Sequence, residues 1–556
     1  MKKFRPSKPE LLYTLKSYNK QKFTADLMAG IIVGIVALPL AIAFGIASGV
    51  GPKEGILTAI VAGFIISAFG GSRVQIGGPT GAFIVIISGI ISQYGIEGLA
   101  VATVMAGVFL ILLGVFKLGT IISYIPYPII IGFTSGIALT IFSTQIKDLF
   151  GLSIDGAVPS DFISKWGCYI DNFGTIDLAT SIVGVMSVVI IAVTPLINKK
   201  IPGSLVAIII MTVAGVVMNN YFDIHVETIG DRFTIDPSMP EAVVPELTWE
   251  RVKGLVSPAI TIAVLGAIES LLSATVADGI IGHKHNSNQE LIGQGIANIA
   301  SPIFGGIPAT GAIARTMANI SNGGKTPIAG IIHAVVLMLI FFFLMPLANY
   351  IPMACLAGVL VVVSYNMSGW RTVKQLMRNP KSDITVLWLT FILTVVFDLT
   401  IAIEVGIVLA CFLCMRRMAE TTQVRVLTDE IDPEDETDME AGNIEHLTIP
   451  EHVEVYEING PYFFGMANKF EDIMNRMKEK PKVRIIRMRR VPFIDSTGMH
   501  NLQNLIELSH NNGIAVILSG VNENVRKVLI KNKFNKLLGE DNICDNINTA
   551  IERAKG

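Results

Sequence analysis

Two long stretches that are almost free of charged residues set the first limit on how this chain can fold. Residues 31–70 and 326–364 contain few acidic or basic side chains, whereas residues 416–556 are crowded with them. A membrane-spanning helix needs about 20 predominantly apolar residues, and 51% of this chain is hydrophobic while only 16% is charged. Average soluble proteins have roughly 25% charged residues. We therefore expect a multi-pass α-helical membrane part followed by a smaller soluble part.

The apolar runs divide the membrane part into fourteen expected segments, which together fill residues 27–415 after an N-terminal segment of residues 1–26. They lie near residues 27–49, 55–70, 80–93, 97–116, 121–145, 176–195, 201–219, 257–280, 289–303, 311–321, 326–347, 351–366, 382–397 and 399–415. Segments three, nine, ten, thirteen and fourteen are short. A short span is tolerated where the helix is broken or sheltered by protein.

The charged residues of the loops predict how these segments are oriented. Lys and Arg gather in the N-terminal tail and in the loops after segments six and twelve, whereas the loops after segments five and seven are acidic. Cytoplasmic loops carry an excess of Lys and Arg. We therefore expect an inner-membrane protein with both termini in the cytoplasm. The N-terminus lacks the apolar core and cleavage site of a signal peptide, so the first segment is expected to remain as an anchor.

One motif occurs twice, in segments three and ten. Residues 77–83 read Gly-Gly-Pro-Thr-Gly-Ala-Phe, and residues 305–313 read Gly-Gly-Ile-Pro-Ala-Thr-Gly-Ala-Ile. An odd offset of seven segments inverts the second copy, so we expect two inverted repeats of seven segments each. Inverted repeats with Gly- and Pro-interrupted spans at matching positions indicate the midplane binding site of a transporter. The alternative is that these residues only kink membrane helices, which are rich in both.

Both copies of the motif are expected to start half-helices near the bilayer centre, at Thr80 or Gly81 and near Gly311. A helix N-terminus offers unpaired N–H groups and a positive dipole end, which bind anions. Arg315 lies one turn into segment ten and is a functional candidate because it is an intramembrane cation. Alternatively, it is a counter-ion for Glu269 or extends to water. The expected anion-binding residues are Pro79, Thr80, Gly81, Ala82, Phe83, Ala309, Thr310, Gly311, Ala312 and Arg315.

Glu269 is a second charge in apolar surroundings, in the middle of segment eight. A carboxylate there is costly to ionise, so it could carry a proton, or bind a cation together with Ser273 one turn further on. A proton is favoured over Na⁺ because a protonated carboxyl is neutral, whereas Na⁺ requires several oxygen ligands. No other cofactor and no metal site is expected, because the five cysteines form no paired zinc pattern.

After Met415 the pattern becomes that of a soluble protein. We expect an acidic linker over residues 416–443 and a small α/β domain over residues 444–556. Its strand-like runs lie at 452–458, 483–488 and 514–519, and its helix-like runs lie near 466–479, 498–511 and 522–532. The net charge of −2 does not fit a nucleic-acid binder. The absence of a nucleotide-binding glycine loop and of a nucleophile paired with a base argues against an enzyme.

Over more than nine-tenths of its length the sequence resembles the bacterial sulfate permease (SulP) family. The resemblance is carried by residues 27–55, the motif of residues 77–83, the Ala-Ile-Glu-Ser-Leu-Leu-Ser-Ala run around Glu269, and residues 306–316. It implies a core and a gate domain, an anion held between segments three and ten, elevator-like movement of the core, and a homodimer.

The C-terminal domain resembles the STAS domain shared with anti-sigma-factor antagonists, including Asp495-Ser496-Thr497-Gly498. In those antagonists the serine after the aspartate is phosphorylated, so the resemblance makes Ser496 a candidate regulatory residue. It also implies a regulatory protein as a partner of this domain. The alternative is that Asp495, Ser496 and Thr497 only cap the following helix.

The leading interpretation is secondary active transport of a small anion by proton symport. The anion is sulfate, bicarbonate or a dicarboxylate; the last two stay open because residues 39–41 read Pro-Leu-Ala where many family members have Pro-Gln-Gly. The alternatives are sodium-coupled bicarbonate symport, anion exchange, a nucleobase carrier of the same fold, and a membrane-tethered signalling scaffold. Nucleobase carriers usually place carboxylates on both the eighth and the tenth spans, so Arg315 favours an anion. The surrounding lipid is the remaining expected partner.

Overall fold

The computed structural model of this chain forms two compact units, Met1–Val408 and Leu409–Gly556. The structure describes residues 8–119, 126–154, 156, 158–159, 161–198, 202–222, 224–234, 238, 242–243, 245, 248–397, 399–427, 430–431, 447–464 and 481–555.

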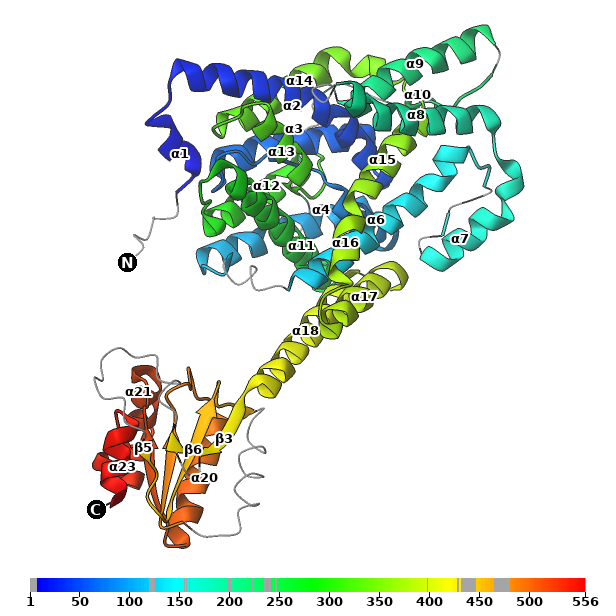
Figure 1. The fold of residues 1–556 in the computed structure, drawn as a ribbon. Coiled ribbons are helices and arrows are strands. Elements are labelled where there is room, and N and C mark those ends of the chain that lie inside the picture. Colours follow the sequence, from blue (N-terminus) through cyan, green and yellow to red (C-terminus); the bar gives the residue numbers. More distant parts are fainter. Residues whose placement is uncertain are drawn as a thin grey trace. The chain divides into compact units, whose positions relative to one another are not determined.

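The described part of the first unit is helical apart from two short strands (Figure 1). The strands are β1 (Gly77–Gly78) and β2 (Thr310–Gly311). The helices are α1 (Glu10–Leu15), α2 (Lys20–Ala47), α3 (Pro52–Phe69), the 3-10 helix η1 (Gly81–Phe83), α4 (Ile84–Val115), α6 (Tyr127–Phe150), α7 (Phe162–Asp171), the 3-10 helix η2 (Phe173–Thr175), α8 (Leu178–Ile197), α9 (Gly203–Tyr221), α10 (Ile229–Arg232), α11 (Trp249–Ile281), α12 (Ser287–Ile303), α13 (Ile313–Ser321), α14 (Ile328–Ala348), α15 (Met353–Met367), α16 (Trp370–Leu376), α17 (Lys381–Val396) and α18 (Leu399–Thr421), which continues into the second unit.

The predicted segments all fall on helices, and α4 covers both the third and the fourth segment. Gly95 interrupts α4 with a φ of 71°, a backbone conformation that favours glycine, at the place where the sequence predicted a short break. Nine of the described helices are long and apolar enough to cross a membrane. Helices α12, α13, α17 and α18, which match segments nine, ten, thirteen and fourteen, are not among them. The mostly helical architecture is confirmed, and the number of spans stays a prediction.

The helices of the first unit pack in two groups. Helices α2, α3, α4, α11, α12, α13 and α14 contact mainly one another, and helices α6, α8, α9, α15 and α17 form the second group. Glycines allow close approach within each group: Gly30 and Gly34 of α2 face α14, and Gly132 and Gly136 of α6 face α17. The grouping joins the first four segments of each repeat in one body, which is the arrangement that a core and a gate require.

The two copies of the repeated motif meet inside the first helix group, where β1 pairs with β2 in antiparallel register. An inverted repeat requires this antiparallel arrangement. A Cβ atom added to Gly311 would overlap Nε2 of Gln75, and one added to Gly78 would overlap Nη1 of Arg315. The glycines therefore leave room for the long side chains of Gln75 and Arg315 beside the paired strands β1 and β2. We call this pair of strands the crossing.

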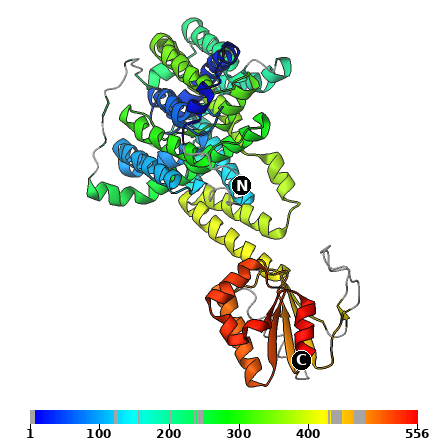
Figure 2. The same ribbon diagram turned by 90° about the vertical axis from the view of Figure 1, so that its left-hand side faces the viewer.

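The second unit contains a five-stranded sheet with helices on both faces (Figure 2). The strand order is β3-β6-β7-β8-β9, in which β3 is antiparallel to β6 and the other pairs are parallel. The elements are β3 (Gln423–Leu427), β4 (Glu430–Ile431), β5 (Leu447–Thr448), β6 (Val453–Asn459), β7 (Val483–Arg487), α20 (Ser496–Asn511), β8 (Ala515–Ser519), α21 (Glu523–Lys531), α22 (Phe534–Leu538), the 3-10 helix η5 (Glu540–Asn542), β9 (Ile543–Cys544) and α23 (Ile547–Lys555).

Consecutive residues of the central strands enter different hydrophobic clusters, as the period of two of a strand requires. Tyr456 packs with α20, α21 and α22 on one face of the sheet, whereas Val455 packs with α23 on the other. Strand β3 lies inside the range that the sequence assigned to a linker, and its Val426 packs against the first of these clusters. The sheet therefore begins earlier than predicted. The expected helix at 466–479 and residues 428–429 and 432–443 of the expected acidic linker lie outside the described residues.

Replacing Gly311 by Ala should lower the melting temperature of the protein in detergent, because the added methyl group overlaps Gln75. Overpacking of this kind costs about 1–3 kcal/mol. Gly89→Ala is the matched control, since a Cβ atom at Gly89 meets nothing within 4 Å. Differential scanning fluorimetry of the three proteins checks this, and equal melting temperatures would show that the crossing has spare room.

A chain ending at residue 443 should aggregate more in detergent solution than a chain ending at Thr422. The longer chain keeps β3 but loses its partner β6, and an unpaired strand edge promotes aggregation. Size-exclusion chromatography of both purified variants tests this. Indistinguishable profiles would show that β3 does not depend on β6.

Candidate functional site

Helix α11 is hydrogen-bonded to both copies of the repeated motif. Oγ1 of Thr80 donates to Oε2 of Glu269 at 2.8 Å, and Oγ1 of Thr310 lies 2.6 Å from Oγ of Ser270. The two threonines hold the same position in the two motif copies, and their partners are consecutive residues of α11. The structure therefore brings the predicted coupling carboxylate into direct contact with the start of the third segment.

The residues at this junction differ in accessibility. Thr80 and Glu269 are half-buried, whereas Pro79 and Gly81 are buried. At the start of α13, Ile313 is 38% exposed. The hydroxyl of Thr80, the carboxylate of Glu269 and the start of α13 are therefore the most accessible parts of the junction.

Neither helix start at the crossing has a side-chain cap. The N-cap residue of η1 is Thr80, whose hydroxyl is used by Glu269. The N-cap residue of α13 is Ala312, which has no polar side-chain atom. The first N–H groups of a helix lack partners within the helix and carry its positive dipole end, so both starts offer donors to an anion.

Three predicted anion-binding residues of segment ten use their main chain for other bonds. The partners are Oδ1 and Nδ2 of Asn298 for Ala309, Oγ of Ser270 for the N–H of Gly311, and the carbonyl of Ile76 for the N–H of Ala312. Helix α13 begins at Ile313, two residues later than the motif suggested. The donors open to a ligand in this segment therefore start at Ile313.

Arg315 is only 2% exposed and lies against the main chain of the first motif copy, just before segment three. Its Nη2 donates to the carbonyl of Pro79, and its Nη1 lies 3.4 Å from the carbonyl oxygen of Gly77. These acceptors are carbonyls rather than the carboxylate of Glu269. A guanidinium has five N–H donors, so Arg315 can hold the crossing together and keep donors for a ligand.

Ser273 and Glu269 have different hydrogen-bond partners. Its hydroxyl donates to Oγ1 of Thr316 at 3.3 Å, and the same Oγ1 accepts the N–H of Ile76 at 3.0 Å. Ser273 therefore links α11 to α13, and it does not share a bond with Glu269 in the described structure. Sequence reasoning missed Ser270, Thr316, Gln75 and Asn298. Their only signal was the presence of polar side chains in apolar surroundings.

Ser496 belongs to the second unit and is exposed at the first position of α20. Asp495 supplies the cap, because Oδ1 accepts the N–H of Gly498 at 2.7 Å and Oδ2 accepts that of Phe464 at 3.2 Å. The helix start therefore does not need the Ser496 hydroxyl. Its regulatory role stays a prediction.

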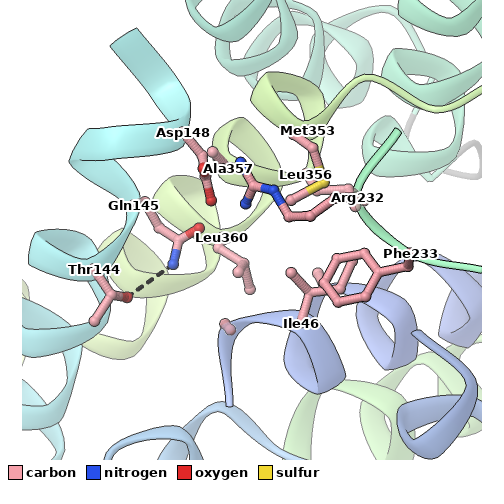
Figure 3. Close-up of a pocket in the computed structure, with 12 residues that line it drawn as sticks. Ile46, Thr144, Gln145, Asp148, Arg232, Phe233, Met353, Leu356, Ala357 and Leu360 are labelled. Atoms are coloured by element: carbon pink, nitrogen blue, oxygen red, sulfur yellow. Dashed lines mark hydrogen bonds and ion pairs between the residues drawn. The ribbon is translucent and has the colours of Figure 1, made fainter. Parts of the chain in front are cut away.

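A cavity of about 160 Å³ lies between the two helix groups of the first unit. Figure 3 shows Ile46 of α2, Gln145 of α6 and Leu360 of α15 around it, with Arg232 and Asp148 at one side. Arg232 pairs with Asp148 at 3.0 Å and also with Glu227. One cation between two carboxylates leaves a local excess of negative charge, so this cavity does not suit an anion.

Comparison with known proteins places both units. Residues 23–390 match the sulfate permease family, and residues 446–550 match the STAS domain. The Bacillus subtilis protein named "Putative sulfate transporter YvdB" is 41% identical over 95% of this chain and 97% of its own length. The bicarbonate transporter BicA of Synechocystis sp. is 30% identical over 95% of this chain and 94% of its own length.

Solved structures show the same architecture. The transmembrane domain of a cyanobacterial bicarbonate transporter, BicA, has a TM-score of 0.62 and 29% identity, and covers 71% of this chain and 98% of its own. The inward-facing murine Slc26a9 anion transporter has a TM-score of 0.88 at 19% identity, covering 100% of this chain and 96% of its own. The second likeness supports the fold alone.

Replacing Arg315 by Gln should weaken anion binding about tenfold or more, because charge-assisted hydrogen bonds contribute about 1.5–3 kcal/mol each. It should also lower the melting temperature, since two carbonyls of segment three lose their donor. Arg315→Lys keeps the charge without the planar fork and should fall between the two. The rise in melting temperature on adding sulfate or bicarbonate measures binding.

Arg251→Gln is the control for this substitution, because Arg251 is exposed and pairs with Glu97. If adding anion raises the melting temperature of the Arg315→Gln protein as much as that of the unaltered protein, Arg315 does not contribute to anion binding.

Proposed function

Because the chain belongs to the sulfate permease family of anion transporters, we propose that it carries a small anion by proton-coupled symport. Its named relatives are transporters and not enzymes. The observation that carries the proposal is the hydrogen bond between Thr80 and Glu269, which joins an ionisable group to the start of the third segment. The substrate is sulfate, bicarbonate or a dicarboxylate, since the relatives are named for the first two.

The proposed anion site lies where η1 and α13 begin. Both helix starts lack side-chain caps, and antiparallel pairing of β1 with β2 holds them close together. Arg315 adds a buried positive charge beside segment three. Two positive helix ends and a guanidinium together neutralise an anion without any metal.

Proton coupling follows from the position of Glu269. When its carboxylate is ionised, it accepts the hydroxyl of Thr80 and places a negative charge beside the helix start, which opposes an anion. When it is protonated, that repulsion is removed and the hydroxyl of Thr80 is free to donate to the anion. Each ligand therefore favours binding of the other, as thermodynamic linkage requires.

Sodium coupling is the second candidate, and the described contacts favour it less. Na⁺ would need several oxygen ligands around Glu269, but Ser273 donates to Thr316 instead. Anion exchange remains an alternative, which the liposome uptake described below separates from symport. A nucleobase carrier would accumulate none of the three anions in that measurement.

For movement, we propose that the group formed by α2, α3, α4 and α11 to α14 slides as a core against the second group, like an elevator. The small cavity beside Arg232 lies between the two groups, so sliding of one group against the other would change its shape. We also propose that the protein lies in the inner membrane with both termini in the cytoplasm. It forms a homodimer, and its STAS domain binds a regulatory protein.

Uptake of labelled sulfate, bicarbonate and fumarate into liposomes, with pH and sodium gradients imposed separately, tests this function. The unaltered protein should accumulate one of these anions when the pH gradient alone is present. Glu269→Gln mimics the protonated carboxyl, so it should abolish accumulation driven by pH while leaving exchange of anion across the membrane. Thr80→Val should impair uptake, and Thr80→Ser should restore most of it.

Accumulation that requires a sodium gradient and does not depend on pH would show that Na⁺, rather than a proton, is the coupling ion. Uptake by Glu269→Gln at the rate of the unaltered protein under a pH gradient would remove Glu269 from coupling.

A further inference from the structure

A second cavity, of about 340 Å³, lies between helices α6, α15, α16 and α17. Its walls are mainly apolar side chains, including Leu139, Phe142, Val361 and Phe391. A volume of this size falls in the range of about 300–1,000 Å³ that is usual for ligand sites. We call this cavity the gate groove.

The serine hydroxyls that line the gate groove are already engaged. Oγ of Ser135 donates to the carbonyl of Ser368 at 2.6 Å, and Oγ of Ser364 donates to that of Val361 at 2.9 Å. An occupant therefore meets hydrocarbon and aromatic surface rather than hydrogen-bonding groups, which suits an acyl chain and excludes the transported anion.

Three aromatic side chains form the accessible edge of the gate groove. Tyr365 is 72% exposed, Trp370 64% and Trp388 37%, and all three line the groove. Trp and Tyr are enriched where membrane meets water, because their rings combine an apolar body with a polar tip. The edge of the groove is therefore expected at the level of the lipid headgroups.

Basic residues follow this aromatic edge along the chain. Helix α16 buries Val373 and Leu376, while Arg371 and Lys374 are exposed. Trp370 and Val373 line the groove, and each is followed directly by one of these cations. Arg378 and Lys381 continue the exposed basic run. An apolar groove lined by a short helix that also carries exposed cations matches a molecule with an apolar tail and a negatively charged head.

We propose that the gate groove binds an anionic phospholipid, with one acyl chain between α6, α15 and α17 and its phosphate held by Arg371 and Lys374. A zwitterionic lipid would fill the groove equally well but would leave these cations without a net negative partner. The occupant lies on the helix group proposed to act as the gate, and the residues that line the groove are not among those of the proposed anion site. The lipid site stands whether the transported anion is sulfate or bicarbonate.

Tryptophan fluorescence provides the test, because Trp370 and Trp388 line the groove. The chain has four tryptophans, so Trp166 and Trp249 are replaced by Phe in every protein compared. Each protein is placed in phosphatidylcholine vesicles that contain a minor fraction of phosphatidylglycerol or phosphatidylcholine with brominated acyl chains. Brominated phosphatidylglycerol should quench at a concentration roughly tenfold lower than brominated phosphatidylcholine, since each basic residue near a membrane surface strengthens the attraction for anionic lipid.

Arg371→Gln together with Lys374→Gln should remove this preference for the anionic lipid. Lys16→Gln with Lys20→Gln is the matched control, because it removes two exposed cations from the N-terminal region and should leave the preference intact. Val361→Phe fills the groove without touching its charges and should reduce quenching by brominated phosphatidylglycerol.

Equal quenching of the starting protein by the two brominated lipids would overturn the proposal, as would an equal loss of preference in both double variants. If neither brominated lipid quenches the fluorescence and two chains can be cross-linked through this face, a second copy of the chain covers the groove instead.

Discussion

The main chain of the two crossing segments must satisfy its polar groups without water, because the hydrocarbon core of a membrane provides none. The structure meets this need with a two-residue ladder and with side chains from neighbouring helices. Asn298 binds both main-chain groups of Ala309, Ser270 receives the N–H of Gly311, and Arg315 serves the carbonyls of segment three. Among the described residues of the crossing, unused donors remain at the two helix starts and on Arg315, so the same requirement that stabilises the crossing also indicates where a ligand could bind.

Helix α11 connects this structural role with the proposed transport role. It contacts both motif copies through adjacent residues, one neutral and one ionisable. The neutral contact, at Ser270, also supports the main chain of Gly311. The ionisable contact, at Glu269, holds the hydroxyl of Thr80, which would otherwise be available at the site. A change in the charge of one side chain can therefore affect the proposed anion site without rearrangement of the ladder.

The sequence predicted the features that depend on local pattern. Apolar runs located the helices, the repeated Thr-Gly-Ala located the crossing, and strand-like runs located the central strands of the STAS domain. It did not predict contacts made by residues far apart in the chain. The position of Arg315 depends on the carbonyl of Pro79, and the role of Gln75 depends on the space above Gly311. Strand β3 was also missed, because it directly follows a helix and its partner β6 comes much later in the chain.

The presence of a single carboxylate beside the helix starts, in the part of the chain that the structure describes, has an electrical consequence. If Glu269 carries one proton for each anion, import of a monovalent anion moves no net charge, whereas import of a divalent anion moves one negative charge inward. Moving an elementary charge against the membrane potential costs about 2.3 kcal/mol per 100 mV. An interior-negative cell would thus resist divalent cargo and leave monovalent cargo unaffected, so the number of ionisable groups at the crossing selects among substrates by valence as well as by shape.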